Sequence, residues 1–309
     1  MRNLVTISDK AYLEKGLTLY DSLENTQKPG SFVLHYICLD DDTYEKVSSI
    51  DKNSIKAIHI SELENDNFEL RNIRNISPSR EAISNGQAQN RDPRHIQFCW
   101  ALASYSCYYF INRVGLENIY YLDADLFFYK DLQLFDDELG DRSVGIVRHR
   151  IDYLASSGEF NVGIVYFRND EKGRRCSDWW KRQLASNPED NPYHAWYGQC
   201  GDQKYLELFP LIFGDSVAIV DDSVGHLAPW NATFHDYSDD KVVWNGKKQE
   251  LLYFHFAHFK INGDSYRTSY NNEWIWGAPE DFHGFVKNKY DNYYTSTIKS
   301  RKNYGLNDE

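Results

Sequence analysis

The hydrophobic pattern at the start of the chain alternates between the period of a strand and that of a helix. Residues 11–26 place apolar side chains near helical spacing, and Asp41 or Asp42 is a candidate cap for a second helix over residues 42–50. Strands are predicted where β-branched and aromatic residues cluster, in the runs NLVTIS, SFVLHYICLDDD and IKAIHI. This alternation is typical of an α/β domain with a mainly parallel central sheet flanked by helices.

The rest of the chain continues the mixed pattern. Residues 71–93 are polar and lack periodicity, which favours a loop, whereas residues 94–115 predict a long buried helix that ends at Gly115. Further strands are expected at residues 118–122, 143–149, 160–167, 216–222 and 251–259, and further helices at residues 170–186 and 201–210. Since no internal repeat or linker interrupts them, the simplest partition is one domain followed by a polar, aromatic tail.

The composition narrows the function classes. The chain has 309 residues and a formal net charge of −12, which argues against a nucleic-acid binder because such proteins usually carry a basic footprint. Its five cysteines contain no C-x-x-C pair, so a disulfide scaffold or zinc cluster is disfavoured and a reducing compartment fits. No stretch has the pattern of a signal peptide or of a membrane span. We therefore expect a cytoplasmic protein.

The stretch YYLDADLFF carries two carboxylates, Asp123 and Asp125, among apolar residues. An ionised carboxylate in such surroundings is costly unless something compensates it. Because alternate residues of a strand point to the same side, the pair predicts a shared cation, a basic cluster or water at a strand end. Carboxylate oxygens suit Mg²⁺ or Mn²⁺, and parallel α/β sheets bind ligands beyond the carboxyl ends of their strands. A second D-x-D at residues 40–42 opens a polar helix, and capping explains it.

Five segments occur in a fixed order between Asn3 and Lys260: LVTISDKAYLEKGLTLYDSL, YYLDADLFFYKDL, FNVGIVYF, GDQKYL and YFHFAHFK. Together they resemble the retaining family 8 glycosyltransferases of the GT-A fold, a family that includes glycogenin and bacterial lipopolysaccharide galactosyltransferases. The resemblance implies a catalytic domain over residues 1–270 and an aromatic, basic tail over residues 271–309. It also implies a Mn²⁺- or Mg²⁺-dependent enzyme that transfers a hexose from a UDP-sugar to a saccharide or glycolipid acceptor with retention of anomeric configuration.

The resemblance implies that different residues bind the nucleotide and the sugar of the donor. Tyr12 is expected to stack on uracil, although an ordinary helix-face aromatic is the alternative. The base and ribose would be lined by Thr6, Ile7 and Ser8. Asn161 is expected to bond sugar hydroxyls, with Asp202 and Gln203 at the reactive face of the sugar ring, where either could instead begin a helix. Arg94 matches, by position only, a basic residue that reaches the diphosphate or the sugar.

The same resemblance predicts the metal and phosphate contacts. Asp123 would contact the ribose and the metal, and Asp125 would bind the metal directly. His255 is the first choice for the third ligand and His258 the second, with the other histidine in the core. Lys260 would contact the diphosphate. The spacing from histidine to lysine in HFAHFK is one residue shorter than in the family.

Other protein classes fit parts of the sequence. A haloacid-dehalogenase-type phosphatase also has a hydrophobic strand before D-x-D, but its motif wants Thr or Val where Phe127 stands. A sugar-nucleotide pyrophosphorylase wants a Gly-rich first loop, which ISDKAY is not. A non-catalytic carbohydrate-binding protein would explain the 23 Tyr and 8 Trp but not the paired aspartates and Lys260.

The tail has its own composition. Residues 282–304 carry five Lys or Arg against one Asp, together with six aromatic rings. Such rings favour a membrane interface, and basic residues bind anionic lipid, which would suit an enzyme that extends a lipid-linked glycan. The alternative is a helix whose aromatic rings pack on the main domain.

Overall fold

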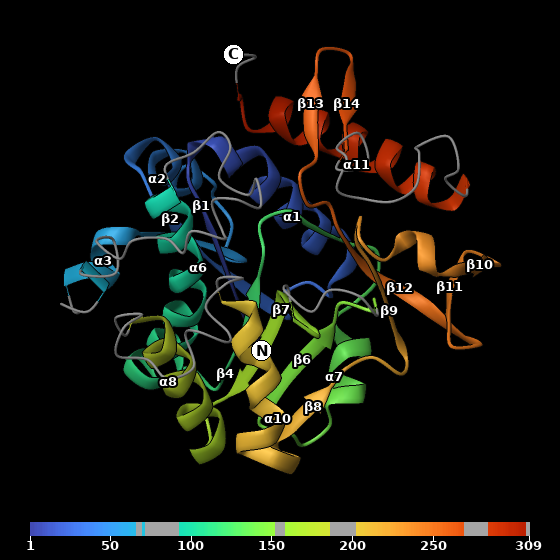
Figure 1. Ribbon diagram of the computed structural model, residues 1–309. Helices are drawn as coiled ribbons and strands as arrows, with labels where there is room; N and C mark the ends of the chain where they lie inside the picture. Colours follow the sequence, from blue (N-terminus) through green and yellow to red (C-terminus); the bar gives the residue numbers. More distant parts are fainter. Residues whose placement is uncertain (66–69, 72–92, 152–157, 186–201, 269–283, 307–309) are drawn as a thin grey trace.

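The computed structural model describes residues 1–65, 70–71, 93–151, 158–185, 202–268 and 284–306, with only the backbone of residues 93–97 (Figure 1). The loop expected over residues 71–93 therefore lies almost wholly outside the described residues. Within them, no helix has both the length and the apolar character needed to cross a bilayer.

A seven-stranded sheet runs through the molecule in the order β3-β2-β1-β4-β7-β6-β8. Neighbouring strands are parallel except where β7 pairs with β4 and β6. The prediction of a mainly parallel central sheet is thus confirmed. The strands are β1 (Arg2–Ser8), β2 (Phe32–Cys38), β3 (Ile55–His59), β4 (Asn118–Leu122), β6 (Val144–Arg148), β7 (Phe160–Arg168) and β8 (Val217–Ile219).

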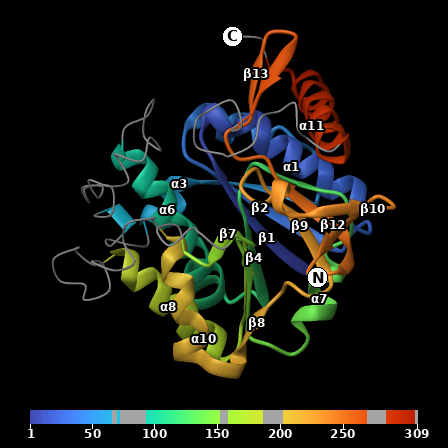
Figure 2. The same ribbon diagram turned by 45° about the vertical axis from the view of Figure 1, so that its right-hand side comes forward.

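Helices cover both faces of this sheet, as Figures 1 and 2 show. Side chains alternate along β1, so Leu4 packs toward the first group of helices and Val5 toward the second. The first group is α1 (Leu13–Thr26), α2 (Asp41–Ser48) and α7 (Gln133–Leu139). The second is α3 (Ile60–Asn65), α6 (Pro93–Tyr108), α8 (Glu171–Ala185) and α10 (Leu208–Phe213). Because both faces are covered, the strands read as nearly continuous apolar runs.

Several predicted helices differ in detail. The cap of α2 is Asp40, whose side chain accepts a hydrogen bond from the Thr43 N–H at 2.8 Å, rather than Asp41 or Asp42, which lie in the first turn. The long helix α6 continues as a π-helical turn (Tyr109–Val114) and ends at Gly115, whose φ of 80° suits glycine. The helix expected over residues 201–210 begins as a 3₁₀ turn (Gln203–Glu207) before α10. Other short 3₁₀ turns are Lys10–Tyr12, Gly214–Ser216 and Ala232–Phe234.

A second sheet was not expected from the sequence. It has the order β10-β11-β12-β5, and β9 also pairs with β12. The strand expected over residues 251–259 belongs to it and ends at His255. A separate hairpin follows. The strands are β5 (Leu126–Phe128), β9 (Val224–Leu227), β10 (Asp236–Ser238), β11 (Lys241–Trp244), β12 (Lys247–His255), β13 (Lys260–Asn262) and β14 (Ser265–Arg267).

The C-terminal helix α11 (Gly284–Asn303) lies alongside α1, and both views show the two helices next to each other (Figures 1 and 2). Tyr290 and Tyr293 are buried, and the Tyr293 ring stacks on Phe256 with centroids 3.9 Å apart. Near the end of the chain, the Tyr304 hydroxyl donates to Asp21 at 2.7 Å. Several of the tail's rings therefore pack against the rest of the protein.

Candidate functional site

Strand pairing brings distant residues to one point. After β4, the Asp123 N–H donates to the carbonyl of Gly163 at 3.0 Å, and the Leu126 N–H closes a turn on the Asp123 carbonyl at 3.2 Å. The chain then enters β5, which pairs with β12 so that Leu126 faces His255. The Phe256 N–H donates to the Asp125 carbonyl at 2.8 Å. This register places the end of β12 directly beside the two aspartates.

Three side chains converge there. His255 Nε2 lies 3.0 Å from Asp125 Oδ1 and 3.6 Å from Asp123 Oδ2. One ligand atom from each of the three lies within 4.8 Å of the others, and His258 is not part of this group in the described chain. The aspartates were expected to point the same way along an extended strand. They converge through a tight turn instead, because the chain leaves one sheet and enters the other between them.

Burial and mutual charge shift the pKa values of these three groups. Burial raises the pKa of Asp123, an effect that Asp125 reinforces and His255 only partly offsets. Burial would also raise the pKa of Asp125, but His255 and Lys15 lower it below its usual value. Burial opposes the charge of His255 as well, yet the two aspartates raise its pKa. Two carboxylates thus lie in a poorly solvated site, where His255 and Lys15 offset the charge of Asp125 more fully than that of Asp123.

The donor atoms at this place suit a divalent cation. Two carboxylates and one imidazole are ligands for Mn²⁺ or, with more oxygen ligands, for Mg²⁺. His255 Nδ1 is buried and has no hydrogen-bond partner in the described structure, while Nε2 faces the carboxylates. A cation would also relieve the like charges that raise the pKa of Asp123. The residues present therefore fit such an ion.

The residues expected to hold the nucleotide lie at the carboxyl end of β1, next to β4. Thr6, Ile7 and Ser8 are buried, and the Ser8 hydroxyl bonds the Tyr36 hydroxyl at 2.7 Å. Tyr12 precedes α1 and is half-buried, with the ammonium of Lys15 4.3 Å from its ring centre. Beyond the carboxyl ends of parallel strands is where α/β sheets bind ligands.

The residues expected to hold the sugar are connected to one another. Asn161 Nδ2 lies 3.5 Å from Gln203 Oε1 and donates to His149 Nε2 at 3.3 Å, while its Oδ1 accepts from the Gly163 N–H at 2.8 Å. His149 Nδ1 donates to the Gly158 carbonyl at 2.8 Å. Burial lowers the pKa of His149 to about 4, so its neutral ring has Nε2 free to accept. These bonds fix the direction of the Asn161 amide.

Asp202 lies close enough to Asp123 for the two carboxylates to interact electrostatically. Its side chain is buried, and its carbonyl accepts a hydrogen bond from Trp180 Nε1 at 3.1 Å. Burial and the charge of Asp123 raise the pKa of Asp202 well above its usual range. Asp202 precedes the 3₁₀ turn, but its side chain makes no capping bond. Capping therefore does not explain its position.

Two residues predicted to bind phosphate, Lys260 and Arg94, make no contact with Asp123, Asp125 or His255 among the side chains that the structure describes. Lys260 begins the exposed hairpin β13–β14, where it affects the electrostatics of the exposed His258. Arg94 lies in the first turn of α6, and its side chain is outside the described part of the protein. Their roles stay predictions.

Sequence reasoning missed four residues of the site. Gly163 is one, because a Cβ there would lie 2.5 Å from Asn161 Oδ1 and 2.9 Å from His255 Nδ1. A glycine inside a strand was the available signal, since it marks close approach of other groups. Trp230 contacts the rings of both His149 and His255 edge-on, with centroids 5.5 and 5.1 Å away. No periodicity pointed to Trp230, His149 or Lys15.

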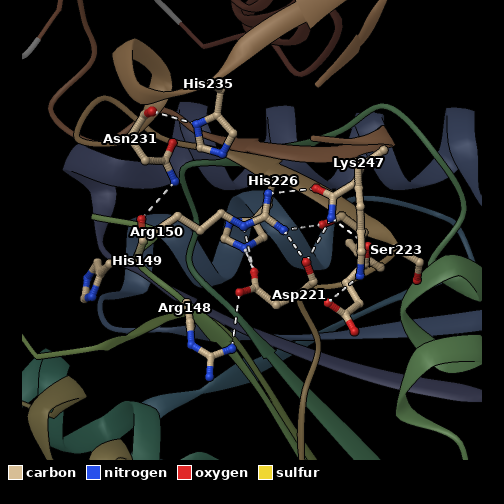
Figure 3. A network of polar contacts seen from close by, with 12 residues as sticks. Arg148, His149, Arg150, Asp221, Ser223, His226, Asn231, His235 and Lys247 are labelled. Carbon is tan, nitrogen blue, oxygen red and sulfur yellow. Dashed lines mark hydrogen bonds and ion pairs between the residues drawn. The ribbon is translucent and has the colours of Figure 1, made fainter. Parts of the chain in front are cut away.

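A network of buried polar side chains surrounds Arg150 and Asp221 (Figure 3). The side chain of Arg150 is fully buried and donates to Asp221 Oδ1 at 2.6 Å and to the Val224 carbonyl at 2.7 Å. His226 bonds the same carboxylate oxygen at 3.2 Å, and Gln249 accepts from Arg150 at 3.0 Å. Arg150 also has a φ of 57°, which is unfavourable for a residue with a side chain. The network therefore holds the segment just after β6 in a fixed, unusual conformation.

Asn231 links this network to the site. It donates to the His149 carbonyl at 3.0 Å and accepts from the Ala228 N–H at 2.8 Å, as Figure 3 shows for the first of these bonds. His235 donates through Nδ1 to the Asn231 carbonyl at 2.7 Å. Asn231 thus fixes the turn that carries Trp230 against the backbone of His149.

Comparison with known proteins identifies the fold. No family model matches the sequence. The chain is 25% identical over 271 residues to the uncharacterized protein YfnF of Bacillus subtilis (strain 168). This alignment covers 83% of this chain and 81% of YfnF. The galactosyltransferase LgtC, solved with donor and acceptor sugar analogs, superposes with a TM-score of 0.57 at 13% identity, covering 96% of this chain and 95% of LgtC. Mouse xyloside xylosyltransferase 1 gives a TM-score of 0.53 at 15% identity, covering 85% of this chain and 98% of that protein. The chain has the GT-A glycosyltransferase fold.

Proposed function

We propose that this protein is a metal-dependent glycosyltransferase that transfers a hexose from a UDP-sugar to a saccharide or glycolipid acceptor with retention of anomeric configuration. The observation that carries the proposal is the convergence of Asp123, Asp125 and His255 at the carboxyl end of β4. The fold supports it, since similar structures include a galactosyltransferase and a xylosyltransferase.

The proposed donor binds across the carboxyl ends of β1 and β4. Tyr12 stacks on uracil, with the base and ribose lined by Thr6, Ile7 and Ser8. Asp123 would contact the ribose and, with Asp125 and His255, would hold Mn²⁺ or Mg²⁺. A divalent ion at this place would act as a Lewis acid that stabilises the leaving diphosphate. Lys260 and Arg94 are the proposed additional phosphate contacts, because developing negative charge needs cations.

The proposed sugar position lies beside Asn161. Its amide is fixed by His149, Gly163 and Gln203, so the remaining lone pair of Oδ1 can accept a bond from a sugar hydroxyl without reorganising. Asp202 or Gln203 steadies the positive charge that develops at the anomeric carbon. Trp230 is half-buried next to His255 and is our candidate for an apolar contact with a bound saccharide.

Contact of α11 with an anionic membrane stays a prediction. Tyr290 and Tyr293 are buried, so such contact would rest on the exposed Lys287, Lys299 and Lys302. Double charge reversal at Lys299 and Lys302 should weaken co-sedimentation with anionic vesicles at low salt. Equal sedimentation of the reversed and unchanged proteins would remove the membrane contact. The expected place of the enzyme is the cytoplasm.

The first test measures nucleotide binding. Isothermal titration should show that UDP binds in the presence of Mn²⁺ and that Asp125→Ala abolishes this metal dependence while the protein remains folded. The matched control is Asp42→Ala, which removes an exposed carboxylate from the other D-x-D. Equal loss in both variants, or no loss in either, would contradict the site.

The second test measures turnover. A panel of UDP-sugars should show slow hydrolysis of at least one donor, with UDP as the product. Release of free phosphate from phosphate esters instead would favour the phosphatase class. Sugar binding without any turnover or UDP binding would favour a carbohydrate-binding protein.

A further inference from the structure

A buried lysine lies beside the two aspartates. Lys15, from the first turn of α1, has 5% of its surface exposed, and its Nζ lies 3.8 Å from Asp125 Oδ2 and 4.3 Å from the centre of the Tyr12 ring. Lysine is almost never this buried unless it is paired, because an ammonium loses strong hydration. The fold therefore places a cation against a candidate metal ligand, at the base of the expected nucleotide position.

Both oxygens of Asp125 are engaged by the protein itself. His255 Nε2 contacts Oδ1 at 3.0 Å, and Lys15 Nζ lies close to Oδ2. A divalent ion that uses Asp125 must share the carboxylate with this ammonium or displace it. Like charges a few ångströms apart repel strongly where water is excluded, so Lys15 opposes the ion.

Lys15 also faces the place where a diphosphate would arrive. Two of its contacts are the candidate metal ligand Asp125 and the ring proposed to stack on the base, and a diphosphate connects those two positions in a nucleotide. The side chain has a flexible four-carbon stem and a compact charge that can turn to a new anionic partner.

On the basis of the proposed function, we propose that Lys15 is a resident cation that weakens divalent-ion binding to the free protein and moves to the nucleoside diphosphate when the donor binds. Asp125 is then released for the ion. Metal and nucleotide consequently bind with positive coupling, and each raises the affinity of the other by the same factor.

A lysine that only balances the charge of the aspartates makes a different prediction. Its removal would also strengthen binding of Mn²⁺ alone, because the carboxylates lose a competing cation, but the gain in affinity from UDP would stay the same. If Lys15 moves to the diphosphate, its removal strengthens binding of Mn²⁺ alone and reduces the gain from UDP. The change in that gain therefore separates the two roles.

The experiment measures Mn²⁺ affinity by electron paramagnetic resonance, with and without UDP. Lys15→Met keeps an unbranched side chain of similar size without the charge, and Lys15→Gln is a second neutral variant. The matched control is Lys52→Met, because Lys52 also pairs with a carboxylate, Glu24, and faces a tyrosine ring, yet lies at an exposed position. We expect both neutral Lys15 variants to bind Mn²⁺ alone about tenfold or more tighter, with a smaller gain from UDP. Lys52→Met should match the unchanged protein.

Three results would overturn the inference. One is Mn²⁺ affinity that is equal or lower in folded Lys15→Met and Lys15→Gln, and another is a gain from UDP that both variants keep in full. The third is failure of both variants to fold, which would make Lys15 structural. In each case, UDP-dependent Mn²⁺ binding by the unchanged protein leaves the proposed function standing. If the unchanged protein binds no Mn²⁺ even with UDP, the proposed function and this inference both fall.

Discussion

Gly163→Ala should impair the site out of proportion to its size. The added Cβ would lie 2.5 Å from Asn161 Oδ1 and 2.9 Å from His255 Nδ1, while ordinary contact begins at 3.4 Å. Asn161 must therefore retreat by about 0.9 Å and His255 by about 0.5 Å, since both start too close to the new carbon. Residue 163 lies in the middle of β7, where alanine is compatible with the backbone, so sterics alone cause the effect.

The expected magnitude follows from these displacements. Overpacking a buried position costs about 1–3 kcal/mol of unfolding free energy. The bond from the Gly163 N–H to Asn161 would also weaken, and a net hydrogen bond is worth about 1 kcal/mol. A shift of about 1 Å in positioning groups reduces turnover on the order of 100-fold. We expect a folded protein with weaker Mn²⁺ binding and strongly reduced turnover.

The assay combines thermal unfolding with Mn²⁺ titration in the presence of UDP. Gly145→Ala is the matched control, since its Cβ would lie 3.0 Å from Leu139 Cδ1 and Phe135 Cζ in the apolar core beside α7. It should lower stability and leave metal affinity unchanged. The reasoning is refuted if Gly163→Ala is folded and binds Mn²⁺ and UDP like the unchanged protein, or if both variants lose affinity equally.

Further predictions concern the metal ligand, the pH dependence of stability and the tail. His255→Ala should weaken Mn²⁺ binding at least tenfold more than His258→Ala, and the reverse order in titration would exchange the two histidines. Tyr293→Ala should cost about 3–5 kcal/mol in chemical denaturation, because the ring is buried against Phe256. Tyr293→Phe should be neutral or stabilising, because the buried hydroxyl has no partner among the described residues; a large loss in Tyr293→Phe would contradict this. Burial lowers the pKa of His35, His149 and His226 to about 4 and that of His235 to about 3. These four histidines are therefore neutral in the folded state, whereas in the unfolded chain they take up protons below pH 6.5. The stability that these four histidines contribute should therefore be complete above pH 6.5 and be lost steadily toward pH 4, and a melting temperature that stays constant over this window would count against it.

Local sequence pattern was enough to predict the class of fold and the first part of the site. Apolar runs between helical segments indicated the parallel sheet, and the confirmed order of β1, α1, β2, α2 and β3 follows from local pattern. Asp123 and Asp125 could be singled out because two charges in an apolar stretch need compensation wherever the chain goes. Such inferences need only short-range information.

Tertiary structure decided what lies opposite those aspartates. The choice between His255 and His258 depends on where β12 ends and on its register with β5, and a slip of one residue would turn a different side chain toward Asp125. The convergence of the aspartates themselves depends on the turn between the two sheets. Neither sheet pairing nor register can be predicted from the local sequence pattern.

The same holds for Lys15 and Trp230. In the sequence, Lys15 is one of many lysines on a helix and Trp230 one of eight tryptophans. Their importance arises from contacts with partners far along the chain. Lys15 contacts Asp125, 110 residues away, and Trp230 contacts His255, 25 residues away. Folding joins such positions because burying apolar faces of the two sheets and α11 fixes the backbones in one arrangement, and the polar groups left at the junction then have only each other as partners.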